Sequence, residues 1–196
     1  MTLLVQIAIY ILQVLAPLFL GMIVLRFLLQ LSRADFYNPF SQAIVKITNP
    51  LLIPIRRLIP GVFGIDIAAI ILAILVQVIY GELVSLLLYQ QMFNPIALVG
   101  YGVLGILNLT VYIFYICLIV MIVASFIAPL STHPALNLVR QLTEPLTAPL
   151  RRIIPPMGGL DFSVLFVFLG LGVVQKVLFF TAVSVNLNPA LVVNYF

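Results

Sequence analysis

Charged residues are scarce in this chain of 196 residues: only 7% are Asp, Glu, Lys or Arg, where a soluble domain carries about 25%. Hydrophobic residues make up 64% of the chain, and the mean hydropathy is +1.31. This composition excludes a water-soluble fold, and it equally excludes a disordered chain, because disorder requires low hydrophobicity and high charge. The sequence therefore predicts an integral membrane protein.

Cysteine and histidine are rarer still, with one of each, Cys117 and His133. A single cysteine excludes an intramolecular disulfide, and the two side chains are too few for a zinc site or a bis-histidine haem. We therefore expect no metal and no cofactor. No Ser-His-Asp set, phosphate-binding glycine loop or pair of catalytic carboxylates can be assembled, so we do not expect an enzyme. Nine basic residues are also too few for a nucleic-acid-binding face.

What the chain does contain is long apolar runs. A spanning helix needs about 20 mainly apolar residues, and such runs lie at about 3–31, 67–88, 98–127 and 162–183. The first run reaches residue 31 only if Arg26 extends its guanidinium to the headgroups. We interpret the third run as one long tilted helix. No basic residue precedes the first run, so it is expected to stay in the mature protein rather than act as a signal peptide.

Outside these spans, basic residues occur only in two loops. The first holds Arg33, Lys46, Arg56 and Arg57, and the second holds Arg140, Arg151 and Arg152. The turn between the second and third spans and both termini have no Lys or Arg. The positive-inside rule therefore predicts that both loops are cytoplasmic and that both chain ends lie outside.

The chain is a tandem repeat. An offset of 95 residues gives 11 identities over the 28 positions 39–66, which chance does not produce. We therefore divide the chain into repeats at 1–95 and 96–196, each consisting of span, loop and span. Since two spans are an even number, both repeats enter the membrane from the same side, as parallel repeats. The predicted fold is an all-α membrane protein with four transmembrane helices.

Each loop is expected to begin with a short amphipathic helix lying in the membrane interface. Asn38 before Pro39, and His133 before Pro134, resemble an N-cap followed by proline at the first helical position. Further prolines then predict a turn-rich strip that holds each arginine pair near the headgroups. These prolines are Pro50, Pro54 and Pro60 in the first loop and Pro145, Pro149 and Pro155 in the second.

The doubled loop motif resembles one family. Each loop reads Pro-Leu-x-x-Pro, a hydrophobic residue, Arg-Arg-x-Ile-Pro and then Gly-x-Asp, and residues 35–42 read Asp-Phe-Tyr-Asn-Pro-Phe-Ser-Gln. These segments are similar to the YggT family of bacterial inner-membrane proteins, also called YlmG, over nearly the whole chain. The resemblance implies an inner-membrane location and a link to tolerance of osmotic or extracytoplasmic stress. Similar chloroplast proteins assist the maturation of cytochrome b6.

The arginine pairs Arg56-Arg57 and Arg151-Arg152 are the main candidate binding residues. Guanidinium groups match phosphate geometry, so the pairs could attract anionic lipid in general or form a defined lipid or partner site. They could also form internal ion pairs with Asp66 and Asp161. These two aspartates directly precede the second and fourth spans, where a carboxylate caps a helix N-terminus.

Four polar residues lie deeper in the spans. Glu82 and Lys176 could each extend to the interface separately, pair with each other, or belong to a proton or ion pathway. Gln13 and Asn108 coincide under the same offset of 95. We interpret them as hydrogen-bonding residues that hold spans one and three together.

Two functions from different classes remain open. The first is a non-enzymatic adaptor or assembly factor whose basic loops contact anionic lipid and an unknown membrane-protein partner. The alternative is a channel or transporter for ions or small solutes, which would need a homo-oligomer, because a single chain has few polar residues along its spans.

The predicted topology can be tested with a reporter that is active only outside the membrane. Fused after Phe196 it should be active, and fused at Asn137 it should be silent. The reverse pattern would show that both the orientation and the loop assignment are wrong.

Overall fold

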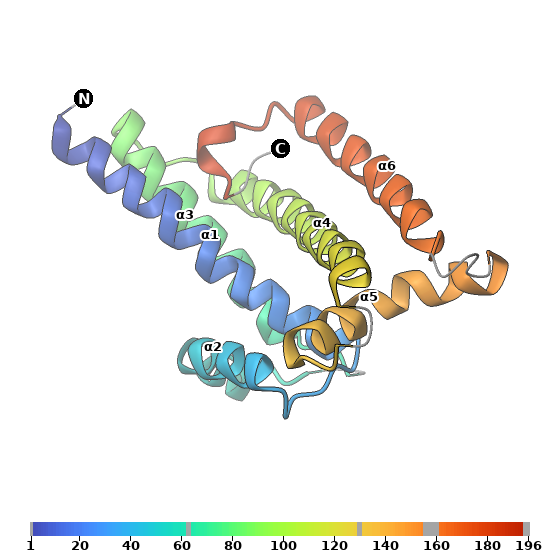
Figure 1. Cartoon of the computed structure of the whole chain (residues 1–196). Helices are drawn as coiled ribbons and strands as arrows, with labels where there is room; N and C mark the ends of the chain where they lie inside the picture. The colour runs from blue at the N-terminus through green and yellow to red at the C-terminus, as the bar shows by residue number, and fades with distance from the viewer. Residues whose placement is uncertain (1, 62–63, 129–130, 155–160, 194–196) are drawn as a thin grey trace.

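A computed structural model describes residues 2–61, 64–128, 131–154 and 161–193. Every regular element within these ranges is helical. Figure 1 shows the arrangement, which consists of α1 (Leu3–Leu31), α2 (Pro39–Leu58), α3 (Ile67–Tyr89), α4 (Pro95–Ile127), α5 (Pro134–Ile153), α6 (Ser163–Ser184) and the short 3₁₀ helix η1 (Pro189–Leu191).

The helices α1, α3, α4 and α6 are long and apolar enough to cross a membrane. Their bounds agree with the predicted spans to within a few residues, and the third run is one continuous helix of 33 residues. Many of their large apolar side chains are exposed, as expected where hydrocarbon replaces water around the protein. The chain is therefore a multi-pass membrane protein with four spanning helices.

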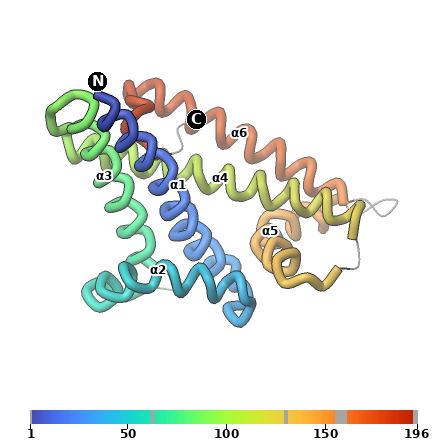
Figure 2. Tube along the Cα trace, turned by 60° about the vertical axis from the view of Figure 1, so that its left-hand side comes forward, coloured from blue at the N-terminus to red at the C-terminus, as the bar shows by residue number. Residues whose placement is uncertain are grey.

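The two repeats fold alike. The loop helices α2 and α5 are both 20 residues long and begin 95 residues apart. Asn38 and His133 are their N-cap residues, and each side chain accepts a hydrogen bond from a backbone N–H in the first turn, which confirms the predicted caps. Figures 1 and 2 show both loop helices at one end of the molecule, here called the loop-helix end, with the N-terminus and η1 at the other end.

The prolines do not stop the loop helices, and the predicted turn-rich strip is wrong. Pro50 and Pro54 lie inside α2, and Pro145 and Pro149 lie inside α5. In each helix the two prolines are four residues apart, so they share one face, and this face is exposed. The carbonyls that lose their N–H partners can therefore be solvated, which lowers the cost of an internal proline. Pro60 follows α2 as an exposed residue, and Pro155 lies outside the described residues.

At the end of the molecule opposite the loop helices, the C-terminal segment packs against α3 and α4. Leu191 and Val193 are buried because the segment after α6 turns back over α3 and α4. Gln77 fixes it in place: its side chain donates to the Leu191 carbonyl at 3.4 Å and accepts from the Val193 N–H at 3.3 Å. A Cβ at Gly105 would lie 2.7 Å from Cγ1 of Val192, so α4 approaches this closely only because residue 105 is glycine.

A pair of glycine substitutions on α4 tests this packing. Gly105→Ala should lower the stability in detergent by about 1–3 kcal/mol, because overpacking displaces the C-terminal segment. Gly100→Ala is the matched control, since nothing lies within 4 Å of its Cβ position, and it should be neutral or stabilise by up to ~1 kcal/mol through helix propensity. Equal melting temperatures for the two variants would contradict the packing described.

Candidate functional site

One arginine of the first pair forms an ion pair with a buried aspartate of the same chain. Arg56 donates from Nη2 to Oδ2 of Asp66 at 2.5 Å and from Nε to Oδ1 at 3.4 Å. Asp66 is only 2% exposed, and its carboxylate also accepts from the Ala69 N–H as the N-cap of α3. This aspartate is thus both a helix cap and an ion-pair partner, so the two roles considered from the sequence coexist.

The second repeat forms the same pair with an additional acid. Arg151 donates from Nε to Asp161 at 2.7 Å and from Nη1 to Glu144 at 3.1 Å. Asp161 also accepts from the Ser163 N–H at 3.0 Å, at the start of α6. Burial opposes the charge of Asp161, but the hydrogen bonds from Ser163 and Arg151 outweigh it and lower the pKa of Asp161. Burial likewise opposes the charge of Arg151, and its hydrogen bond to Asp161 and the charge of Glu144 raise its pKa.

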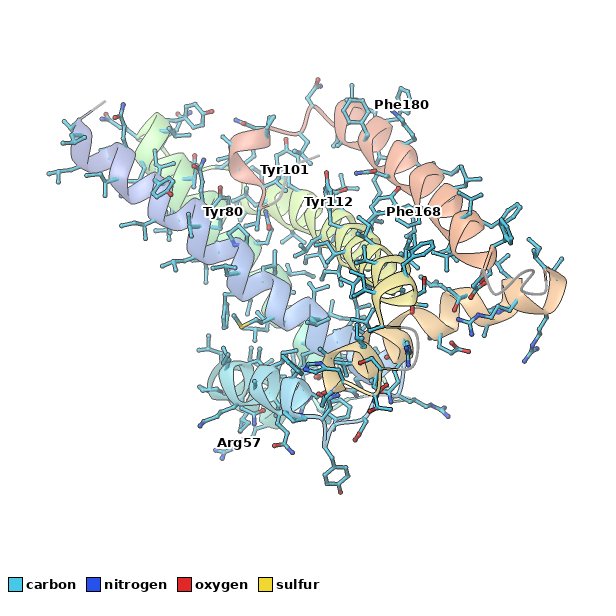
Figure 3. The ribbon with its side chains drawn as sticks, in the orientation of Figure 1. Arg57, Tyr80, Tyr101, Tyr112, Phe168 and Phe180 are labelled. Carbon is cyan, nitrogen blue, oxygen red and sulfur yellow. The ribbon has the colours of Figure 1, made fainter. Side chains whose placement is uncertain are left out.

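The other arginine of each pair faces outward. Arg57 and Arg152 are exposed, and neither forms an ion pair with a described residue. Figure 3 shows Arg57 on the side of α2 that points away from the spanning helices. Each pair therefore has an inner arginine that belongs to the fold and an outer arginine that is free to bind something else.

Arg26 was not among the residues selected from the sequence, and its position is unexpected. Its side chain turns inward against α2 rather than outward: it is 4% exposed, and Nη1 donates to the Val45 carbonyl, to Oγ1 of Thr48 at 2.6 Å and to Oδ1 of Asn49 at 2.8 Å. These bonds tie α1 to α2. A polar Thr-Asn pair beginning 22 residues after an arginine was the only sequence signal for this contact.

The two loop helices meet at their N-terminal ends. The Asn38 side chain donates to the Pro134 carbonyl at 2.7 Å, and the Asp35 N–H donates to the side chain of Gln141 at 2.9 Å. The rings of Phe40 and His133 also lie 6.2 Å apart. From this junction the C-terminal ends of α2 and α5 run to opposite sides of the molecule (Figure 1), so the two outer arginines are far apart.

Of the three alternatives for Glu82 and Lys176, a pairing of the two is not found among the described residues. Glu82 is half-buried and accepts from the Phe93 N–H at 3.1 Å, closing the turn between α3 and α4. Lys176 is exposed on α6, and the ion pairs between described residues do not include it. Because the turn that follows α3 brings a backbone donor to Glu82, this carboxylate does not need a partner on α6.

The expected contact of Gln13 with Asn108 is also wrong. Gln13 is exposed on α1, whereas Asn108 is fully buried. Equal positions in two repeats do not make equal environments, since α1 lies at the edge of the molecule near its N-terminus and α4 lies at the centre (Figure 1). Gln77, which sequence analysis did not select, is a polar side chain that does link distant segments, since it joins α3 to the C-terminal segment.

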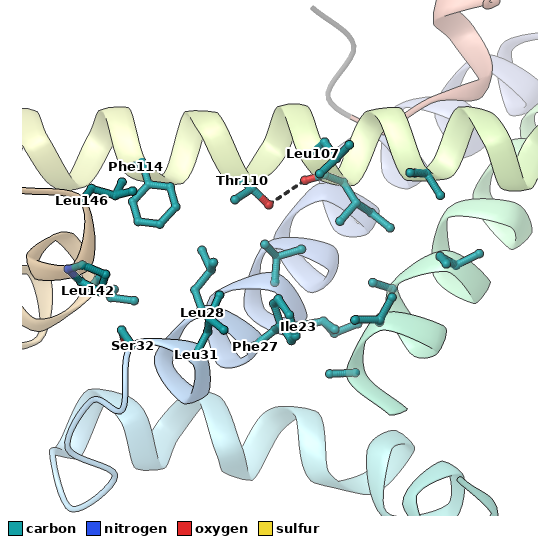
Figure 4. Close-up of a pocket in the computed structure, with 18 residues that line it drawn as sticks. Ile23, Phe27, Leu28, Leu31, Ser32, Leu107, Thr110, Phe114, Leu142 and Leu146 are labelled. Carbon is teal, nitrogen blue, oxygen red and sulfur yellow. Dashed lines mark hydrogen bonds between the residues drawn. The ribbon is translucent and has the colours of Figure 1, made fainter. Parts of the chain in front are cut away.

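An apolar cavity of about 410 Å³ lies between α1, α3, α4 and α5. Figure 4 shows its lining, in which Phe27, Leu107 and Phe114 are among the labelled residues. The hydroxyl of Thr110 donates to the Ile106 carbonyl at 2.8 Å, so this polar group is satisfied within its own helix. None of the described residues that line the cavity is charged.

Two parallel span-loop-span repeats with basic loop helices define a class of multi-pass membrane protein. The sequence model of the CCB3/YggT family matches residues 5–87 and again residues 100–182. The chain belongs to this family, and the match to each repeat confirms the resemblance first seen in the loop motif.

Several bacterial proteins are similar over most of their length. Uncharacterized protein PA0392 of Pseudomonas aeruginosa is 44% identical over 86% of this chain and 86% of its own. Uncharacterized protein YggT of Escherichia coli K12 is 34% identical over 85% of this chain and 86% of its own. A protein encoded in the proC 3' region of Vibrio alginolyticus is 39% identical over 83% of this chain and 88% of its own. No solved structure gives a significant match.

The division of each arginine pair into inner and outer residues predicts unequal effects of mutation. Arg56→Gln should lower stability in detergent by about 1–3 kcal/mol, because the buried Asp66 loses its charged donor. Arg57→Gln is the matched control, with the same change one residue away, and its melting temperature should stay unchanged. If both variants melt alike, the ion pair does not hold the fold as described.

Proposed function

We propose that this protein is a non-enzymatic adaptor or assembly factor of the bacterial inner membrane. Its loop helices lie on the cytoplasmic surface, and their outer arginines contact anionic lipid and a membrane-protein partner. The resemblance noted from the loop motif supports a role in tolerance of osmotic or extracytoplasmic stress. The orientation follows from the positive-inside rule.

The two-sided surface of α2 carries this proposal. Four large apolar side chains, which lie 7, 4 and 7 residues apart and so share one face, are exposed: Phe40, Ile47, Leu51 and Leu58. Lys46 and Arg57 are exposed on a neighbouring face, about 110° around the helix from this stripe. A helix with an apolar stripe and a basic face lies in the membrane interface, where the basic face meets headgroups and solvent.

The rigid attachment of both loop helices also favours an adaptor. The inner arginines fasten the C-terminal ends of α2 and α5 to the starts of α3 and α6, and the junction at Asn38 fastens their N-terminal ends to each other. The outer arginines are therefore presented at fixed places, which suits recognition of a partner. Each basic residue near an anionic leaflet contributes about 1 kcal/mol of attraction.

The proposal predicts a partner whose binding depends on the outer arginines. Wild-type protein purified in native lipid should retain a membrane protein in stoichiometric amount, identified by mass spectrometry. Changing Arg57 and Arg152 together to Gln should remove most of this partner and the stress tolerance, while the melting temperature stays the same.

Lys176→Gln serves as the control, because it removes an exposed positive charge from α6, away from the loop helices. It should retain the partner. A homo-oligomer without partner that conducts ions in liposomes would replace the adaptor function by the transport alternative.

A further inference from the structure

A polar hollow lies at the loop-helix end of the first repeat, between α1, α2 and the start of α3. Its volume of about 610 Å³ falls within the range of roughly 300–1,000 Å³ that is usual for ligand sites. Arg26, Gln30, Arg56 and Asp66 line it, together with the apolar side chains of Phe36 and Val45. It thus joins two guanidinium groups with one carboxylate.

The positive charges in this hollow are not balanced. Asp66 pairs with Arg56, and the ion pairs between described residues do not include Arg26. The three groups that accept hydrogen bonds from Arg26 are a backbone carbonyl, a hydroxyl and a side-chain amide, all neutral. A charge that is 96% buried, with 4% exposed, calls for a counter-ion, because burial without one is costly.

The free edge of the Arg26 guanidinium points to the kind of ligand that is missing. All three hydrogen bonds of this side chain use Nη1, and Nε is buried without a partner. Nε and Nη2 form one edge of a guanidinium, the same edge with which Arg56 grips the two oxygens of Asp66. Such an edge presents two parallel N–H donors, a fork that fits carboxylate and phosphate oxygens.

The depth of Arg26 fits a lipid headgroup. It lies five residues before the end of α1 at Leu31, or about 7 Å along the helix axis. The hollow is therefore near the level where the hydrocarbon gives way to the phosphate layer of the membrane. Gln30, one turn further on, donates to the Gly64 carbonyl at 3.1 Å and so holds the rim of the hollow in place.

The second repeat lacks this arrangement and provides an internal comparison. The offset of 95 places Met121 at the position of Arg26 and Glu144 at the position of Asn49. The Thr143 hydroxyl bonds to the sulfur of Met121, and Arg151 is paired with two acids, Asp161 and Glu144. Among the described residues at these equivalent positions, the second repeat has no buried cation without an acidic partner, so this reason for binding an anion applies to the first repeat.

We infer that this hollow is a specific site for the phosphate of one anionic phospholipid, held by the free edge of Arg26 beside Arg56. The inference rests on the proposed function only in placing the loop-helix end at the anionic leaflet. It differs from the general attraction of the outer arginines, because the ligand enters the molecule and completes the contact between α1 and α2.

The test measures binding of phosphatidylglycerol to the full chain, delipidated in detergent, by native mass spectrometry. The wild-type protein should bind one molecule tightly. Arg26→Met, which copies the residue of the second repeat, should weaken this binding at least tenfold because both fork and charge are lost. Lys176→Gln removes the same charge from an exposed position on α6, away from the loop helices, and should change the affinity less than twofold.

Arg26→Lys keeps the charge without the fork and should weaken binding severalfold. It is the decisive variant if Arg26→Met fails to fold by circular dichroism and gel filtration. Equal losses in the Arg26 and Lys176 variants would overturn the site and leave only diffuse attraction. Equally tight binding of zwitterionic phosphatidylcholine would overturn its selectivity for an anionic lipid.

A second experiment distinguishes the phosphate of a lipid from free inorganic phosphate as the ligand. Inorganic phosphate in excess should not displace the lipid. If it does, and raises the melting temperature of the wild type as phosphatidylglycerol does, the hollow binds a free anion and the lipid assignment is wrong. The partner assay of the proposed function tests Arg57 and Arg152, whereas the lipid-binding assay tests Arg26. Each proposal can therefore fail without the other.

Discussion

The ion pair between an arginine near the end of a loop helix and an aspartate ten residues later holds each repeat together. The aspartate begins a spanning helix, where it caps backbone N–H groups, but its charge needs a cation once the bundle covers it. Arg56 and Arg151 supply that cation. Because each pair joins two residues only ten positions apart in the sequence, the C-terminal end of the loop helix is held beside the start of the spanning helix that follows it.

The two repeats share this ion pair and the same order of helices, but they differ in how closely their helices pack and in their polar side chains. The first repeat is closely packed: α3 contacts α1, α2, α4 and η1, and Gln77 binds the C-terminal segment. In the second repeat α6 packs mainly on α4 and α5, which leaves much of its surface to the membrane. The repeats also differ in their polar groups: the position of Arg26 in the first repeat is occupied by Met121 in the second. A duplicated fold can thus keep its architecture while one half acquires a binding site.

The contacts considered for Glu82 and Gln13 were not found, because the partner of a polar side chain depends on which residues lie near it in the folded structure. Glu82 accepts a hydrogen bond from the Phe93 N–H rather than pairing with a lysine. Gln13 is exposed because α1 lies at the edge of the molecule. The prediction that prolines would end α2 and α5 was wrong because it, too, depended on the environment in the folded structure. Their cost depends on whether the freed carbonyls are buried or solvated, and burial is a property of the whole fold.

The sequence by itself determined the four spans, the duplication, the helix caps at Asn38 and His133, and the class of protein. These features depend on local composition, spacing and charge, which do not change when the chain folds. Only the tertiary structure decided which arginine of each pair turns inward and that Arg26 lies buried beside α2. Two adjacent arginines are equivalent in sequence, and they differ only because a helix directs consecutive side chains about 100° apart, one toward an aspartate and one toward solvent.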